Sequence, residues 1–319
     1  RPPPQDGSDP KPPLLLRHAL AHSVNRAAEW ALAELGADNV ATWARATGIT
    51  SALKPTKSLA LGAYEVTPRE LAGAYGTFAG GGQYIEPRLI KRIVGPDGKD
   101  VMLPSRPAPR QVLDEAEAYI VTNLLESVVK EGTGRRARTL NIPLAGKTGT
   151  TNASKDAWFA GYSPNVVCVV WTGYDDAISL GSRESGATAA LPAFIDFMRA
   201  AHRGAAVAPW ARPDGVVSIA IDPKSGLLPY EGQEKVALEV FLAGTEPRKK
   251  VESPADEDPY ADLDEPDAGA GETDAGVVDA APPKPRKPAT KTPPGNAAPP
   301  RASSKPAVLP ATTSDPPPF

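Results

Sequence analysis

The sequence has few of the residues that build metal centres and disulfides. Its 319 residues include one cysteine, Cys168, and three histidines, His18, His22 and His202. A single cysteine excludes an internal disulfide, and these four residues lack the spacing of a zinc site. His18 and His22 lie one helical turn apart without a third ligand, so we interpret them as part of a solvated helix face. The sequence therefore predicts no metal site.

A long apolar run and an excess of one charge are also missing. The best apolar run, residues 166–171, has the length of a strand, far below the ~20 residues that span a bilayer. Lys and Arg number 35 against 38 Asp and Glu, and the formal net charge of −3 excludes nucleic-acid binding through bulk positive charge. The chain starts at Arg1 without a basic-then-apolar leader, so we expect an internal start and a missing upstream segment.

Proline is abundant, and its uneven distribution predicts the domain organisation. The chain has 37 prolines, more than twice the roughly 5% of an ordinary globular chain. Both ends are Pro-rich, and the C-terminal end is first acidic and then basic, with few apolar groups to offset the entropy of ordering. We predict a Pro-rich linker at 1–13, a folded domain at 14–204, a β-rich extension of that domain at 205–250 and a disordered tail at 251–319.

Periodicity and capping signals predict the elements between these ends. We expect helices at 14–36 (two pieces, with Ser23 or Asn25 as the N-cap of the second), 40–47, 68–79, 114–130 and 189–202. We expect strands at 145–150, 157–162, 166–174, 216–221 and 236–241, and a hairpin of two strands at 89–94 and 101–103 around a Gly-Pro-Asp-Gly turn.

Two short motifs carry the chemistry. Lys147-Thr148-Gly149-Thr150 places an ammonium beside hydroxyl groups on a predicted strand, and Gly149 leaves room for an extended ligand along the strand edge. Such a strand suits a peptide carboxylate. Upstream, Ser23 and Asn25 form a Ser-x-Asn string at a helix junction, where helix capping is the simpler interpretation of the string alone.

In combination and in this order, the two motifs resemble those of the transpeptidase domain of class A penicillin-binding proteins. The resemblance covers about residues 14–247, and the family's order is kept in the stretches 61–79, 131–134, 156–162, 170–176 and 241–247. It implies an α+β fold in which helices pack on an antiparallel sheet, here N-terminally incomplete. It implies no metal or organic cofactor.

The resemblance also implies a role for each motif residue. Lys147 would polarise the site, and Ser23 would relay a proton between the nucleophile and the leaving amine. Asn25 would hold the amide of the substrate. The hydroxyls of Thr148 and Thr150 would receive the terminal carboxylate of a D-Ala-D-Ala peptide or a β-lactam, and the backbone N–H of Thr150 would be an oxyanion donor.

The family's nucleophile is the part of the pattern that does not match. It is the serine of a Ser-x-x-Lys string placed upstream of Ser-x-Asn, and only 22 residues precede Ser23 in this sequence. Two literal strings, Ser51 to Lys54 and Ser127 to Lys130, lie between the other two motifs, and we interpret both as chance matches. We expect this chain to lack its nucleophile and to be inactive alone.

The function implied for the parent protein is D,D-transpeptidation, which cross-links peptidoglycan stem peptides at the extracytoplasmic face of the bacterial plasma membrane. Its partners would be stem peptides and β-lactams, and it would contact the membrane only through an upstream anchor. The tail is a candidate for binding a partner or a wall polymer, and a spacer without a binding role is the alternative. Two alternatives stay open: a D,D-carboxypeptidase or serine β-lactamase, in which water takes the acyl group, and a non-catalytic wall-binding scaffold.

Overall fold

The computed structural model describes residues 14–253, so the predicted linker at 1–13 and nearly all of the predicted tail lie outside the described residues. The described residues form both helices and strands, and the first half of the chain is mainly helical. The helices are α1 (Leu16–Ala21), α2 (Asn25–Leu35), α3 (Ala37–Ala46), η1 (Lys57–Leu61), α4 (Pro68–Ala79), α5 (Glu115–Lys130), η2 (Arg135–Leu140), η3 (Asn152–Ser154), η4 (Gly186–Ala190) and α6 (Leu191–Ala201). The strands are β1 (Gln83–Tyr84), β2 (Arg110–Gln111), β3 (Ala145–Thr150), β4 (Asp156–Tyr162), β5 (Val167–Gly173), β6 (Val216–Ile221) and β7 (Ala237–Leu242).

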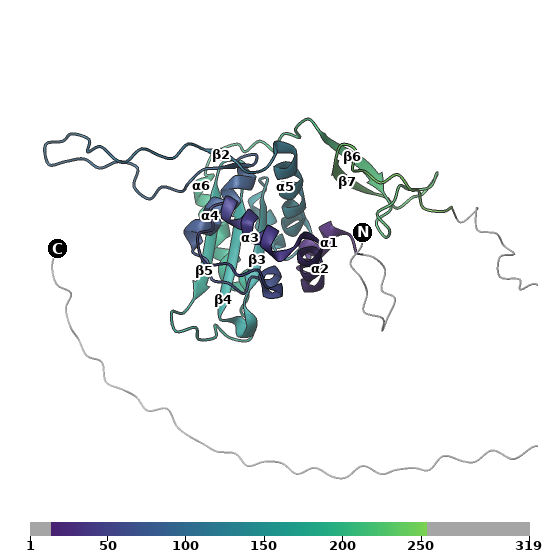
Figure 1. Cartoon of the computed structure of the whole chain (residues 1–319), viewed down its shortest axis with the longest axis horizontal. Helices are drawn as coiled ribbons and strands as arrows, with labels where there is room; N and C mark the ends of the chain where they lie inside the picture. Colours follow the sequence, from purple (N-terminus) through teal and green to yellow (C-terminus); the bar gives the residue numbers. More distant parts are fainter. Residues whose placement is uncertain (1–13, 254–319) are drawn as a thin grey trace, which may run out of the picture. The chain divides into compact units, whose positions relative to one another are not determined.

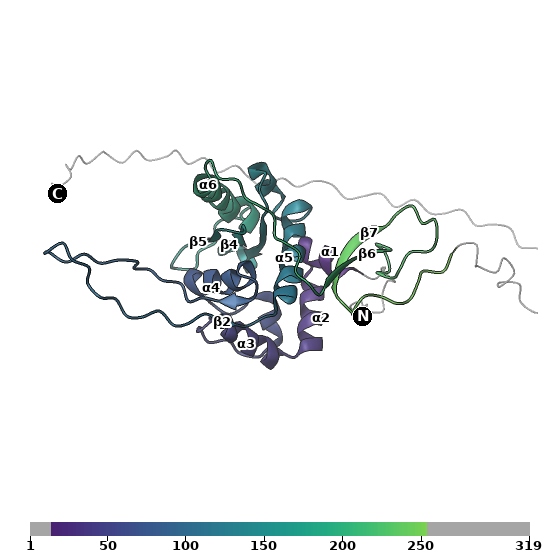
Figure 2. The ribbon, with the colours of Figure 1, turned by 90° about the horizontal axis from the view of Figure 1, so that it is seen from above.

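A three-stranded antiparallel sheet, in the order β3-β4-β5, forms the centre of the fold. Figure 1 shows α5 alongside β3, and the view from above in Figure 2 shows α6 on one side of β4 and β5 and α4 on the other. Side chains alternate across β4. Phe159 stacks against Phe194 of α6, with ring centroids 4.5 Å apart, whereas the Tyr162 hydroxyl lies 2.9 Å from the Thr122 hydroxyl of α5. Helices therefore cover both faces, which confirms the predicted α+β class.

Helix α4 begins as its sequence predicts. The Thr67 hydroxyl accepts from the Glu70 N–H at 3.2 Å, the Glu70 carboxylate accepts from the Thr67 N–H at 2.8 Å, and Pro68 occupies the first turn. The second helical piece differs from the prediction, because the N-cap of α2 is Val24 and no side chain caps it. Ser23 and Asn25 are thereby left exposed and free of a capping role.

The predicted strands at 89–94 and 101–103 are wrong. The Gly95–Lys99 turn is present. The flanking residues, however, form one isolated β-bridge, between Val94 and Asp100, instead of two paired strands. Residues 85–109 instead form an extended arm between β1 and β2, visible in Figures 1 and 2 as the long blue double segment. Leu89 is 85% exposed and Met102 is 94% exposed, so no layer covers the arm and supplies the burial that a two-stranded ladder needs.

Strands β6 and β7 form a separate antiparallel hairpin that is tied to α1 and α5. Arg17 of α1 forms an ion pair with Glu239 of β7 and donates to the Asn123 carbonyl (2.9 Å) and the Ser127 hydroxyl (2.6 Å) of α5. The half-buried Arg17 thus joins three elements. Within residues 14–253, the helices are too short or too polar to cross a bilayer.

Candidate active site

Ser23 and Lys147 come together although 124 positions separate them in the chain. The Lys147 amine donates a hydrogen bond of 2.8 Å to the Ser23 hydroxyl. Ser23 lies in the short link between α1 and α2 with φ of 56°, a left-handed conformation that is uncommon for residues other than glycine. Such outliers persist where the surrounding structure holds them, and they often mark functional sites.

The amine of Lys147 lies in a partly desolvated environment at the middle of β3. Burial lowers the pKa of Lys147 to about 8. Its other contacts are oxygens of the next residue, the Thr148 carbonyl at 3.0 Å and the Thr148 hydroxyl at 3.5 Å. An amine with a pKa near neutrality can both give and take a proton at physiological pH, which suits a proton-transfer role.

The Thr148 hydroxyl is held by a residue that the sequence-based site assignment missed. Thr133, in the turn that follows α5, places its hydroxyl 2.8 Å from that of Thr148. The Thr133 N–H donates to the Ala21 carbonyl at the end of α1, at 3.1 Å. One turn therefore contacts both the segment that leads to Ser23 and the strand that carries Lys147. The Gly-Thr-Gly string at 132–134 was the available sequence signal.

Gly186 is a second missed contributor, and it packs directly on the Lys-Thr-Gly strand. A Cβ on Gly186 would lie 2.3 Å from the Trp158 carbonyl oxygen and 2.6 Å from that of Gly149, so only glycine fits. The Gly186 N–H donates to the Thr150 hydroxyl at 3.0 Å. This contact occupies a lone pair of the exposed Thr150 oxygen and leaves its own O–H free to donate to a ligand.

The ligand-facing part of the site is the free edge of β3. This strand ends the three-stranded sheet, with β4 on one side and no partner strand among residues 14–253 on the other. Asn25, the first residue of α2, is exposed, and its carboxamide makes no hydrogen bond to another described residue. Lys147, Thr148 and Thr150 thus lie on a strand edge that an extended peptide can join.

The two Ser-x-x-Lys strings between Ser23 and Lys147 are occupied elsewhere, and a third, Ser8 to Lys11, lies outside the described residues. The Ser51 hydroxyl donates to the Glu70 carboxylate at 2.7 Å, and Ser127 is buried and accepts from Arg17. Partial burial alone would raise the pKa of Glu70, but hydrogen bonds from Thr50, Thr67 and Ser51 outweigh it and hold that pKa well below its usual range. Neither serine has a hydrogen bond to Lys147.

The titration of Lys147 gives a direct test of the desolvated site. We expect a midpoint near 8 in the folded chain and near 10.5 in the chain unfolded in urea, measured by NMR of ¹³C-labelled lysine side chains. The unfolded chain then binds more protons between these pH values, so the contribution of Lys147 to stability rises with pH in that window. A Lys147→Met variant assigns the signal and should lose the rise; a folded-state midpoint above 10 would contradict a desolvated amine.

Comparisons with known proteins agree with this geometry. Residues 4–198 match the family described as the penicillin binding protein transpeptidase domain, and residues 212–253 match the penicillin-binding protein 1A C-terminal domain. The chain is 43% identical to penicillin-binding protein 1A of Aquifex aeolicus over 73% of this chain and 32% of the relative. It is 35% identical to that of Pseudomonas aeruginosa over 81% of this chain and 38% of the relative.

Solved structures show the same similarity. Penicillin-binding protein 1A from Haemophilus influenzae superposes with a TM-score of 0.69 at 29% identity, covering 78% of this chain and 44% of that chain. PonA1 of Mycobacterium tuberculosis in complex with penicillin V superposes with a TM-score of 0.53 at 26% identity, covering 62% of this chain and 59% of that chain. The chain spans about a third of the length of the two curated relatives.

Proposed function

Because the chain belongs to the penicillin-binding protein transpeptidase family, we propose that its Ser23–Lys147 site is part of a D,D-transpeptidase centre. The observation that carries this proposal is the 2.8 Å contact of Ser23 with Lys147 beside the free edge of β3. The first segment matches the transpeptidase-domain family and the second the penicillin-binding protein 1A C-terminal domain, which favours a transpeptidase over a carboxypeptidase or a β-lactamase.

The substrate is a stem peptide that ends in D-Ala-D-Ala. It lies extended along β3, and its terminal carboxylate accepts hydrogen bonds from the hydroxyls of Thr148 and Thr150. The Lys147 ammonium adds a positive charge on the same strand. Asn25 donates its carboxamide N–H to a backbone carbonyl of the peptide, and the Thr150 N–H stabilises the oxyanion of the tetrahedral intermediate.

The reaction is two successive acyl transfers. A serine oxygen attacks the carbonyl carbon of the D-Ala-D-Ala bond, its proton passes through Ser23 to the leaving nitrogen, and D-alanine departs. An amine of a second stem peptide then attacks the acyl ester, gives up its proton by the reverse route and leaves a cross-link. Lys147, with a pKa of about 8, keeps the Ser23 hydroxyl in a proton-transfer network at neutral pH.

We place the acylated serine outside residues 1–319. Support comes from two of the three Ser-x-x-Lys strings, because Ser51 is bonded to Glu70 and Ser127 is buried against Arg17. The third string, Ser8 to Lys11, lies outside the described residues. The parent enzyme would act at the extracytoplasmic face of the plasma membrane. Its C-terminal part would consist of the linker 1–13, the domain 14–204, the extension 205–250 and the tail 251–319. The tail would bind a partner or a wall polymer.

Ligand binding by the full chain tests the proposed carboxylate site. We expect a stem peptide ending in D-Ala-D-Ala to shift the NMR amide signals of Lys147, Thr148 and Thr150. The same peptide with a C-terminal amide lacks the carboxylate and should produce shifts at least about tenfold smaller at equal concentration. Thr150→Val should weaken binding of the acid by about tenfold, since it removes a hydrogen bond to a charged group.

Fluorescent penicillin separates the remaining alternatives. The 319-residue chain should not become covalently labelled. Labelling that maps to Ser8, Ser51, Ser127 or any other serine of the chain would contradict the placement of the nucleophile. Equal binding of the acid and amide peptides would favour the non-catalytic scaffold.

A further inference from the structure

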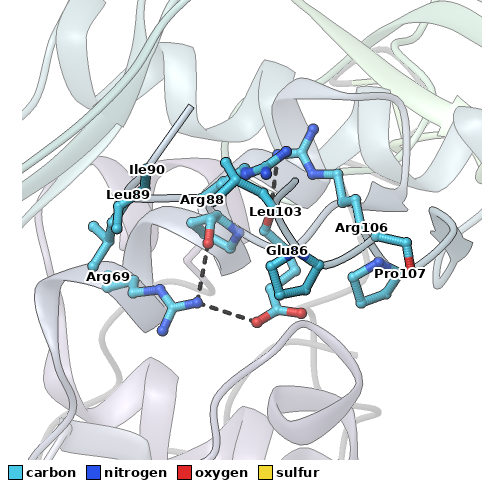
Figure 3. Close-up of a pocket in the computed structure, with 11 residues that line it drawn as sticks. Arg69, Glu86, Arg88, Leu89, Ile90, Leu103, Arg106 and Pro107 are labelled. Carbon is cyan, nitrogen blue, oxygen red and sulfur yellow. Dashed lines mark hydrogen bonds and ion pairs between the residues drawn. The ribbon is translucent and has the colours of Figure 1, made fainter. Parts of the chain in front are cut away.

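The arm (residues 85–109) carries a groove at its base that has no part in the proposed transpeptidase site. The groove is a hollow of about 320 Å³ between the two limbs of the arm and the first turn of α4. Figure 3 shows its side chains, with the Arg69–Glu86 ion pair along one side. The lining residues are Arg69, Glu86–Ile90 and Leu103–Pro107, and neither Ser23 nor Lys147 is among them.

The lining combines apolar side chains with cations that lack carboxylate partners. Pro87, Leu89, Ile90, Leu103, Pro104 and Pro107 supply most of the apolar wall. Arg69 is paired with Glu86, at 3.1 Å. Arg106 donates to the Glu86 carbonyl, which is neutral, and the exposed Arg88 guanidinium has no hydrogen bond or ion pair to another described residue.

The main chain of the two limbs is also open to a ligand. Among residues 14–253, the bonds that join the limbs cluster near the tip, where the Val101 N–H donates to the Ile93 carbonyl at 2.9 Å. Nearer the base, no backbone hydrogen bond joins the limbs within the described residues, and side chains reach across instead: Arg106 donates to the Glu86 carbonyl and Arg69 to the Pro87 carbonyl. Unpaired extended backbone beside apolar pockets is the arrangement that recognises an extended peptide.

We propose that this groove binds an extended acidic segment of a partner protein. Leucine-like side chains of the segment would enter the hollow between the prolines and Leu103, and its carboxylates would meet Arg88 and Arg106. The volume matches the lower end of ordinary ligand sites, which suits a few side chains rather than a folded domain. Charge complementarity selects the acidic partner, because neither cation has a carboxylate partner among residues 14–253.

Two other occupants fit the arm less well. A polyanion would use the cations and leave the apolar wall exposed. An anionic bilayer would need several free cations toward the tip, but there Arg92 is paired with Asp100 at 2.7 Å and Lys99 with Asp97 at 3.7 Å. Lys91 is left as the single unpaired cation of that part of the arm among the described residues, whereas Arg88 and Arg106 line the hollow at the base.

Peptide binding to the full chain tests this inference, measured by fluorescence anisotropy. The probe is a labelled peptide of alternating aspartate and leucine residues. Its counterparts are an asparagine–leucine peptide, which lacks charge, and an aspartate–glycine peptide, which lacks the apolar groups. We expect the aspartate–leucine probe to bind at least about tenfold more tightly than either counterpart.

A charge-reversed groove should lose the probe. Arg88→Glu combined with Arg106→Glu is expected to weaken binding by at least about tenfold, while the matched control Arg203→Glu, at another exposed arginine, changes it less than about twofold. Thermal melting verifies that each variant is folded. Three results would overturn the inference: equal binding of all three peptides, an equal loss in Arg203→Glu, and Leu89-dependent binding of anionic vesicles without binding of the probe. None of these readouts uses the transpeptidase site.

Discussion

Gly132→Ala is expected to lower the thermal midpoint of unfolding by about 6–12 °C. The cause is a collision between two backbones. A Cβ on Gly132 would lie 2.1 Å from the carbonyl oxygen of Ala21 and 2.7 Å from its carbonyl carbon, and neither atom can rotate away as a side chain can. Relief requires α1 and the turn after α5 to separate. We assign this overpacking a cost of about 3 kcal/mol, which gives the stated shift for a domain of this size.

The same substitution should disturb the site, because Ala21 lies two residues before Ser23. Separation of α1 from the turn after α5 lengthens the 3.1 Å hydrogen bond from the Thr133 N–H to the Ala21 carbonyl. It also loosens the contact between the Thr133 and Thr148 hydroxyls. The D-Ala-D-Ala probe should therefore bind at least about tenfold more weakly than to the unchanged chain.

Gly76→Ala is the matched control for Gly132→Ala. Gly76 lies within α4, and a Cβ there meets nothing within 4 Å. We expect its midpoint to stay unchanged or to rise by about 2 °C, since alanine loses less backbone entropy in a helix. A Gly132→Ala chain that melts within 1 °C of the unchanged chain would show that the two backbones are not packed as described.

The sheet and the long helices could be predicted because their signals are local. Helix α5 has an acidic N-cap at Asp114 and an apolar face at helical spacing, and β4 and β5 are short, largely apolar runs bounded by turns. The arm could not be predicted, because its short apolar stretches on either side of a turn resemble the two strands of a hairpin. Whether a layer covers such a segment is decided by tertiary structure alone, and here none does.

The residues of the candidate site likewise fall into those that the sequence predicted and those that it did not. Ser23 and Lys147 were recognised through short motifs that resemble a family, whereas their contact depends on how α1 and β3 meet. Thr133 was missed although it lies in a Gly-Thr-Gly string, because its contact with Thr148 depends on how the turn after α5 meets β3. Gly186 was missed because its contribution is a close approach, which leaves no pattern in the sequence. For Gly186 the reason is visible only in the structure, where the Trp158 carbonyl excludes a side chain.

Arg17→Met is expected to lower the free energy of unfolding by about 3 kcal/mol. Glu239 is 13% exposed in its side chain, and Arg17 supplies both of its carboxylate oxygens with hydrogen bonds. Removing one partner of a largely buried pair leaves the other charge without compensation, which costs more than the pair itself contributes. The substitution also removes the hydrogen bonds from Arg17 to the Asn123 carbonyl and the Ser127 hydroxyl, which adds a smaller cost. Urea denaturation of the full chain measures the change.

A double-mutant cycle separates the Arg17–Glu239 coupling from the general loss of packing. Glu239→Gln keeps the shape and an acceptor, so it should cost about 1 kcal/mol, and the double variant should recover about 1–2 kcal/mol of the summed losses. Arg69→Met is the control, because Arg69 and Glu86 form a similar pair at 50% and 45% exposure and exposed pairs contribute under about 1 kcal/mol. Equal losses of unfolding free energy in Arg17→Met and Arg69→Met would contradict a stabilising role of the Arg17–Glu239 pair. If the losses differ as expected, the β6–β7 hairpin stabilises α1, the helix that leads into Ser23. The two segments that match family models, 4–198 and 212–253, then unfold as one cooperative unit.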